Sequence, residues 1–156
     1  MSISLVQYVR FKTRAGSYTG SPYQNFFINE TKSYGGVTYS YAPFAIAINA
    51  GSKGGDRSEN SLIAPNSAIS VNLFAEAVLQ SYLLEVKTMQ LSVADFSDVA
   101  LIGDELWRVA SLNSDEENVT LRLMSPLDAV RGQVPRRILT SSLVGSLPTS
   151  ATLTSR

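Results

Sequence analysis

Four carboxylates lie within eleven residues of the chain, at Asp95, Asp98, Asp104 and Glu105. Carboxylate oxygens are the ligands that a hard cation such as Ca²⁺ prefers. Their spacing does not match the Asp-x-Asp-x-Asp-Gly loop with its closing Glu. We therefore favour a solvated acidic rim over a cation site, and we expect no metal and no cofactor.

The chain contains neither histidine nor cysteine. Histidine is the commonest general base and metal ligand, and cysteine supplies thiol nucleophiles, thiolate ligands and disulfides. Serine, threonine, lysine and paired carboxylates remain, but no convergent group of them can be named in the sequence. We expect a protein that is not an enzyme, with a wall hydrolase as the weakest alternative.

Length and charge are typical of one ordinary domain. The 156 residues balance 13 basic against 13 acidic side chains, so net charge gives no argument for nucleic acid or an anionic membrane. No apolar run reaches the roughly 18 residues that span a bilayer, and the first eight residues do not resemble a signal peptide. We expect synthesis in the cytoplasm and no membrane contact.

A β-hairpin is the clearest local prediction. Residues 105–112 and 118–124 alternate apolar and polar side chains around a polar connection. Trp107 and Val109 share the face of Val119, Leu121 and Leu123, whereas Arg108, Thr120 and Arg122 point the other way. We expect Arg108 and Arg122 to form structural pairs or to contact a neighbouring copy.

One amphipathic helix is expected at about residues 70–82. The apolar residues follow helical spacing, with Ser70 as the N-cap; they are Val71, Phe74, Ala75, Val78, Leu79 and Tyr82. Packing on a sheet is favoured over a groove for a partner helix.

The remaining segments alternate as strands and loops. Residues 5–11 predict a strand with Leu5, Gln7, Val9 and Phe11 on one face, and residues 44–50 predict an apolar, central or covered strand. Residues 92–103 predict a loop. The tyrosines of residues 18–41 favour a small core or a subunit contact, with a sugar- or peptide-binding surface as the alternative. The fold class is mainly β (α+β), a small β-barrel or β-sandwich with one helix.

The C-terminal segment differs in composition. From residue 131 onward there are four arginines and no acidic residue, with apolar residues at intervals. We expect a domain at residues 1–131 and an extended arm at residues 132–156, ordered against a neighbour. The arm complements the acidic region 95–117 in charge. Its candidate inter-subunit contacts are Pro135, Arg136, Arg137, Ile138, Leu139, Leu143, Val144 and Leu147.

Several of these stretches together resemble a known family. They are YAPF at residues 41–44 before an apolar strand, a Gly-rich loop, the helix VNLFAEAVLQSYLL, the hairpin end LRLMSPLDAV and the exit VPRRILTSSLVGSLPTS. The chain resembles the N-terminal part of phage tail-tip proteins of the lambda-type minor tail protein L family, and related tail hub proteins of siphophages and gene-transfer particles. The resemblance covers residues 37–150. Long members continue into a cysteine-bearing domain with an iron–sulfur cluster, which is not expected in a chain without cysteine.

The resemblance implies a structural protein at the distal end of a phage tail. Such hub domains form rings, here a trimer or a hexamer, and they contact tail-tube, distal tail and other hub proteins. Contact with nucleic acid would arise only through the tail lumen. Two alternatives stay open: a neck protein, meaning a tail terminator or head–tail connector, and a host-surface module that binds glycan through the tyrosines.

Overall fold

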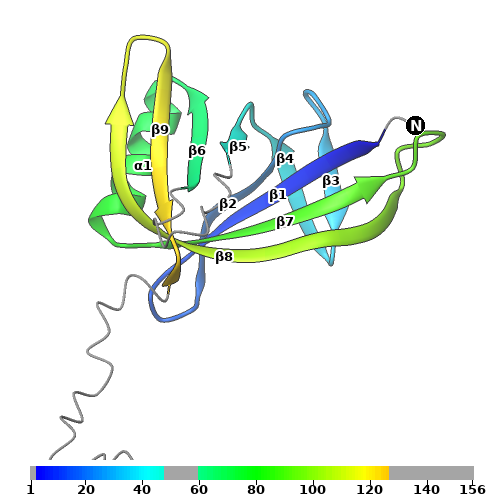
Figure 1. The fold of residues 1–156 in the computed structure, drawn as a ribbon, viewed down its shortest axis with the longest axis horizontal. Helices are drawn as coiled ribbons and strands as arrows, with labels where there is room; N and C mark the ends of the chain where they lie inside the picture. Colours follow the sequence, from blue (N-terminus) through cyan, green and yellow to red (C-terminus); the bar gives the residue numbers. More distant parts are fainter. Residues whose placement is uncertain (1–2, 48–59, 127–156) are drawn as a thin grey trace, which may run out of the picture.

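The structure is a computed structural model, and it describes residues 3–47 and 60–126. In these residues nine strands form a single mixed sheet in the order β3-β4-β2-β1-β7-β8-β9-β6-β5 (Figure 1). Only the β2–β4 pair is parallel. The fold class, mainly β with one helix, is confirmed. The elements are β1 Ser4–Lys12, β2 Tyr18–Gln24, β3 Thr31–Tyr34, β4 Val37–Tyr41, β5 Ala45–Ala47, β6 Asn60–Pro65, α1 Ala68–Leu79, β7 Leu83–Leu91, β8 Asp98–Ser114 and β9 Asn118–Met124.

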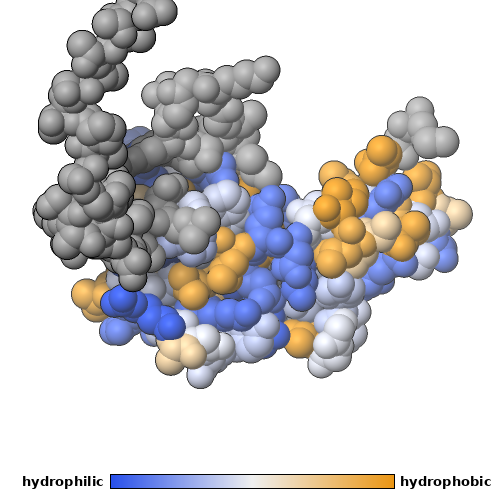
Figure 2. All heavy atoms as spheres, turned by 60° about the horizontal axis from the view of Figure 1, so that its bottom comes forward, coloured by the Kyte–Doolittle hydropathy of each residue, from blue (hydrophilic) through white to orange (hydrophobic). Residues whose placement is uncertain are grey.

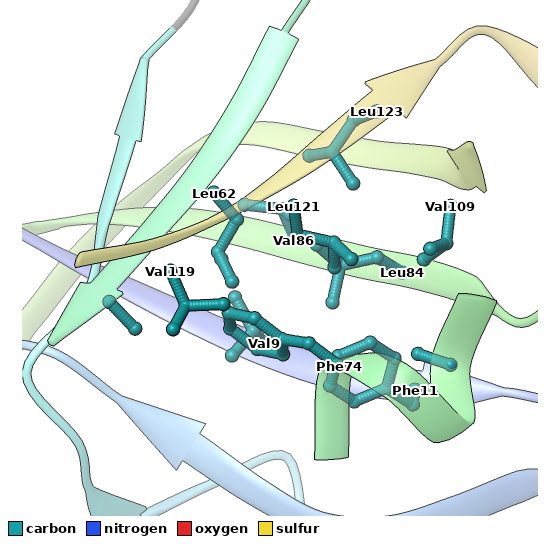
Figure 3. Close-up of a cluster of buried hydrophobic side chains, with 12 residues drawn as sticks. Val9, Phe11, Leu62, Phe74, Leu84, Val86, Val109, Val119, Leu121 and Leu123 are labelled. Atoms are coloured by element: carbon teal, nitrogen blue, oxygen red, sulfur yellow. The ribbon is translucent and has the colours of Figure 1, made fainter. Parts of the chain in front are cut away.

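The first core lies where the sheet curls beneath α1. It takes buried side chains from five strands and the helix (Figure 3). Only three residues separate β4 from β5, while β4 pairs with β2 and β5 pairs with β6. The short connection therefore joins β4, next to one end of the strand order, to β5 at the other end, and this half of the sheet curls around its core (Figure 1). The sequence left barrel and sandwich open; the strands form one curled sheet.

A second core lies on the opposite face of the same central strands. Along β1, Val9 and Phe11 are buried in the first core, whereas Val6 and Tyr8 are buried in the second. Successive residues of a strand point to opposite faces, so the strand changes its buried face between Tyr8 and Val9. Val9 and Phe11 of the predicted face of β1 are thus buried, but Leu5, the first residue of that face, is exposed.

Aromatic side chains fill this second core. The rings of Tyr8 and Tyr34 stack with centroids 5.0 Å apart, and Tyr39 lies 4.7 Å from Tyr8. Phe26 contacts both Phe27 and Phe96, at 5.1 and 5.6 Å between centroids. The tyrosine-rich region 18–41 therefore builds a small core, which was the favoured interpretation of its sequence.

The helix differs from its predicted register. It begins two residues earlier than predicted, because Ser67 is the N-cap and its Oγ accepts from the Ser70 amide at 3.2 Å. It ends at Leu79, since Ser81 has a φ of +52° that a helix cannot continue. Phe74 and Ala77 are its buried residues, whereas the predicted core residue Leu79 is 79% exposed.

Two further predictions are wrong in part. Residues 98–103 are the first part of the seventeen-residue strand β8 rather than a loop. The strand predicted at 44–50 is described only as β5, Ala45–Ala47, and it lies at the edge of the sheet order instead of its centre. Residues 48–50 lie outside the described part. By contrast, the hairpin is confirmed from Arg108 onward, with Val109 opposite Leu123 and Leu112 opposite Leu121, whereas residues 105–107 pair only with β7.

Candidate assembly surface

The outer edge of β8 has no strand partner along its first ten residues in the part of the chain that the structure describes. β8 pairs with β7 from Asp98 to Arg108, but with β9 only from Arg108 to Ser114. The backbone from Asp98 to Trp107 therefore presents one open edge, which we call the β8 free edge. In Figure 1 it runs along the lower side of the extended half of the molecule. Open edges are sites where another chain can add a strand.

Two bulges shape this free edge. The pairing with β7 skips Val99 between Asp98 and Ala100, and skips Ile102 between Leu101 and Gly103. A bulge adds one residue to one strand and resets the alternation of its side chains. Direct pairing places Leu101 opposite Met89 and Asp104 opposite Lys87. The bulge at Ile102 thus keeps Leu101 and Asp104 on one face, which a simple period of two would not.

Large apolar side chains are exposed along the free edge and at its end. On β8 they are Val99, Leu101, Ile102 and Leu106, and the start of β1 and the β7–β8 turn add Ile3, Leu5, Val93 and Phe96. Figure 2 shows apolar residues gathered at the end of the molecule where β1 begins. We call these eight residues the apolar tip. Leu5 and Leu101 lie on opposite faces of the sheet, because Leu5 pairs with Gln90 and Leu101 with Met89. Exposed apolar residues gathered at one end of a molecule often mark an interaction site.

The four carboxylates of this region are held separately and do not converge. Asp95 accepts from Ser97 within the β7–β8 turn, Asp98 accepts from the Tyr8 hydroxyl at 3.4 Å, and Asp104 pairs with Lys87 at 3.9 Å. Glu105 accepts from the indole N–H of Trp107 at 3.0 Å. Among the described residues, no group of three or more acidic side chains is placed to hold a metal ion. Asp98, Asp104 and Glu105 instead place negative charge along the free edge, and Lys87 offsets part of it at Asp104.

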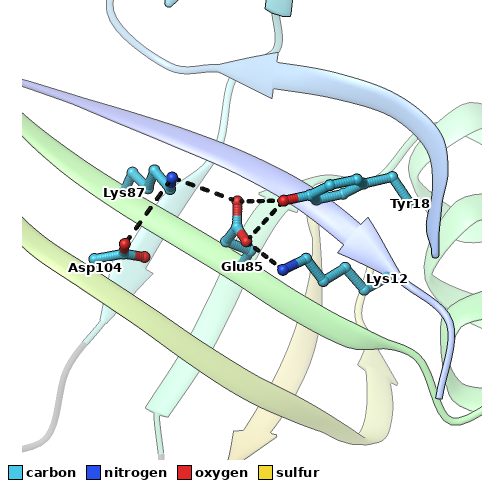
Figure 4. A network of polar contacts seen from close by, with 5 residues as sticks. All are labelled: Lys12, Tyr18, Glu85, Lys87 and Asp104. Carbon is cyan, nitrogen blue, oxygen red and sulfur yellow. Dashed lines mark hydrogen bonds and ion pairs between the residues drawn. The ribbon is translucent and has the colours of Figure 1, made fainter. Parts of the chain in front are cut away.

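Glu85 of β7 is a buried carboxylate that pairs with Arg10 of β1 on one side and with Leu106 of β8 on the other. Lys12 Nζ lies 2.6 Å from Glu85 Oε2, and the Tyr18 hydroxyl donates to the same carboxylate at 3.2 Å (Figure 4). Burial by itself would raise the pKa of Glu85, but Lys12, Lys87 and Tyr18 outweigh it, so its pKa is lowered. The Glu85 hydrogen bond raises the pKa of Lys12. Glu85 is therefore a structural anion, charged at neutral pH.

An apolar cavity of about 80 Å³ lies on the other half of the molecule. Its walls come from α1, from the segment between β4 and β5, and from the first core; Ile69, Leu73, Pro43 and Phe44 are among them. An engineered apolar cavity that binds benzene measures about 150 Å³, roughly twice this volume. This one therefore suits an aliphatic side chain and not an aromatic ring.

The predicted contact residues fall in two groups. Arg108 and Arg122 lie on the outward face of the β8–β9 hairpin, next to buried Val109 and Leu121. Arg108 also marks the start of the free edge. The predicted contacts of the arm, from Pro135 to Leu147, and the boundary at residue 131 lie outside the described residues.

The sequence did not identify the free edge. Its signal was the mixture of four large aliphatic residues with three carboxylates between residues 98 and 106. A solvated loop does not need such aliphatic side chains, so their presence was informative. The carboxylates alone suggest a solvated acidic rim, and only the aliphatic residues between them indicate the exposed strand.

Comparison with known proteins shows a likeness in fold. No protein-family model matches the chain, and no curated protein matches it. A solved chain described as "Virion of native gene transfer agent (GTA) particle" has a similar fold, with a TM-score of 0.51 and 12% identity. The match covers 83% of this chain and 43% of that one, so this chain spans less than half of the neighbour's length.

The helix content bears on membranes. Within residues 3–47 and 60–126, no helix has the length and apolar character needed to cross a bilayer.

Proposed function

We propose that this protein is a structural component of a bacteriophage-like virion, a subunit of a ring at the distal end of the tail. The ring would link the tail tube to tip or fibre proteins. The observation that carries the proposal is the β8 free edge with its apolar tip. The similarity in fold to a chain of a gene transfer agent virion supports the same class of role.

The free edge suits repeated assembly. A ring requires a heterologous interface, in which one surface of a subunit binds a different surface of the next. An open strand edge supplies backbone hydrogen bonds, and the apolar residues on it supply buried area. Natural monomers protect long edges with charges, bulges or covering loops. Here the two bulges carry the large aliphatic residues Val99 and Ile102, 59% and 57% exposed, which favours use of the edge over its protection.

Among the described residues, every buried side-chain nitrogen or oxygen has a hydrogen-bond partner. Glu85, the most buried acid, is neutralised by lysines, and the Tyr8 hydroxyl donates to Asp98. The glycan alternative is disfavoured because Tyr34 is stacked on Tyr8 and Tyr23 packs against the first core. The faces of both rings are therefore occupied by contacts within the molecule and are not available to stack on a sugar.

A neck protein is the second candidate. A tail terminator or connector would also form a ring, and the similarity to a virion chain supports either position. Labelling intact particles with an antibody to this chain separates the two, with an antibody to a capsid protein as the control. Label at the distal tail end supports the hub role. Label at the head–tail junction moves the function to the neck, and absence of label from particles that contain the gene would contradict both.

A further inference from the structure

The β8 free edge begins where β9 leaves the ladder. The last β8–β9 pair joins Met124 to Arg108, and the next two residues are Ser125 and Pro126. A strand continuing in the same direction would run beside Trp107 toward Asp98. Pro126 instead adopts a helical conformation, and proline has no backbone N–H for a ladder. The β9 pairing therefore ends at Met124, and the edge stays open within the described residues.

The open edge defines the chemistry of a strand that could fill it. Residues 98–107 contain three carboxylates and no basic residue. Their aliphatic side chains are exposed, and Asp104 is 54% exposed on its side chain. An occupant with complementary chemistry must offer an extended backbone, positive charges and apolar side chains at intervals.

One segment of this same chain has that composition. Residues 131–156 contain four arginines and no acidic residue. Apolar side chains recur between residues 134 and 147; they are Val134, Ile138, Leu139, Leu143, Val144 and Leu147. We propose that residues 134–147 of one copy add as a strand to the β8 free edge of the next copy. This inference rests on the proposed ring and names what joins its subunits.

The neighbouring copy is favoured over the same chain as the acceptor. Pro126 lies two residues beyond the end of β9 and has no backbone N–H, so β9 cannot simply continue as a ladder strand along its own free edge. A donor segment at one place and an acceptor edge at another also make a heterologous contact, which closes into a ring when the rotation permits. Donation between neighbours enlarges the interface of a small domain without a second folded surface.

Cross-linking of the full-length protein tests this arrangement directly, because the natural chain has no cysteine. One sample carries Ala100→Cys on the exposed free edge, and a second carries Ser141→Cys or Ser142→Cys in the donor segment. Adjacent donor positions are used because side chains alternate between faces of a strand. A short bismaleimide is added to the mixed samples. Leu79→Cys on the exposed side of α1 replaces Ala100→Cys as the matched control.

The inference predicts a cross-linked dimer in the Ala100→Cys mixture, with at least one donor position, and little with the Leu79→Cys control. A doubly substituted chain that links only to itself would place the segment on its own edge and overturn the proposal. Equal cross-linking of the control, or no cross-link at any donor position, would overturn it as well.

Charge reversal provides a second measurement that does not depend on register. Arg136→Glu with Arg137→Glu should weaken self-association about tenfold by sedimentation, as expected for two partly exposed ion pairs. Mixing that donor with an Asp104→Arg acceptor should recover part of the loss. Unchanged association after arginine reversal would overturn the inference. If the protein is found at the tail tip of particles but no cross-link forms, the strand donation is wrong and the proposed function stands. If the cross-link forms but the protein is absent from particles, the proposed function is wrong.

Discussion

Tyr8 and Val9 are neighbours in β1, yet their side chains are buried in two different cores on opposite faces of the sheet. Both residues are almost completely inaccessible, at 1% and 3% exposure. The β1–β7 pair is therefore the shared element of two separate packing units. One unit closes under α1, and the other supports the half of β8 that carries the free edge.

Separate cores predict separate local stabilities. Met89→Ala removes a buried side chain from the second core, and such truncations cost about 2–5 kcal/mol. Amide hydrogen exchange in β3 and β4 should then accelerate more than exchange in α1, because sub-global units open independently. Val86→Ala in the first core is the matched variant and should have the opposite pattern. Equal acceleration everywhere in both variants would show a single cooperative unit.

The packed face of α1 gives a prediction about stability. Phe74→Ala should lower the free energy of unfolding by about 3–5 kcal/mol, since Phe74 is buried in the first core. Leu79→Ala should change it by less than about 0.5 kcal/mol, because Leu79 projects into solvent. Urea denaturation followed by Trp107 fluorescence measures both. A large loss at Leu79 would mean that this side of the helix is covered by another part of the protein.

The N-cap of α1 gives a second prediction. Ser67→Ala removes the oxygen that accepts from the Ser70 amide and should cost about 1 kcal/mol. Ser70→Ala keeps that amide and should cost less, although it removes the 2.9 Å contact between the two hydroxyls. Thermal unfolding of the two variants compares them. A larger loss of stability in Ser70→Ala would mean that Ser70 is the N-cap, as the sequence pattern predicted.

The pKa of Glu85 predicts how stability depends on pH. Its pKa in the folded protein is lowered from the ordinary value of 4.5, because Lys12, Lys87 and Tyr18 outweigh burial. The stabilisation is therefore complete above pH 4.5 and is lost as pH falls through the folded pKa. Denaturation at pH 7 and below 4.5 should show a smaller decrease in Glu85→Gln than in the natural protein. Identical decreases would mean that other carboxylates govern the acid transition.

The apolar part of the free edge predicts a separation of assembly from folding. Ile102→Lys places a charge on an exposed bulge residue, so the free energy of unfolding should change by less than about 0.5 kcal/mol. Self-association and incorporation into particles should fall, because the charge would have to be buried at the interface. Ile28→Lys, at an exposed site in a loop of the other edge, is the control. Normal incorporation of the Ile102→Lys protein into particles would show that the free edge is not part of the interface.

The sequence predicted the elements whose patterns are local. The hairpin was recoverable because residues 118–124 alternate cleanly and face a polar connection. The helix was recoverable in position but not in register, since Ala75 and Leu79 fit the apolar stripe as well as Leu73 and Ala77 do. Only the position of the sheet decides which side of the helix is buried.

The free edge was not predictable by the same means. Its bulges at Val99 and Ile102 break the period of two, so the first part of β8 has no strand pattern of its own. That part is extended because it pairs with β7, which is a tertiary cause. The change of buried face at Tyr8 and Val9 likewise follows from the packing of two cores on opposite faces of β1, which a single alternating pattern does not predict.

The most direct test of the proposed role is a cryo-electron-microscopy map of the intact particle at side-chain resolution. The account predicts this chain in a closed ring at the distal end of the tail, with the backbone from Asp98 to Trp107 paired to a neighbouring chain. A ring at that position with this edge facing solvent would contradict the assembly surface. Absence of the chain from the particle would contradict the function itself.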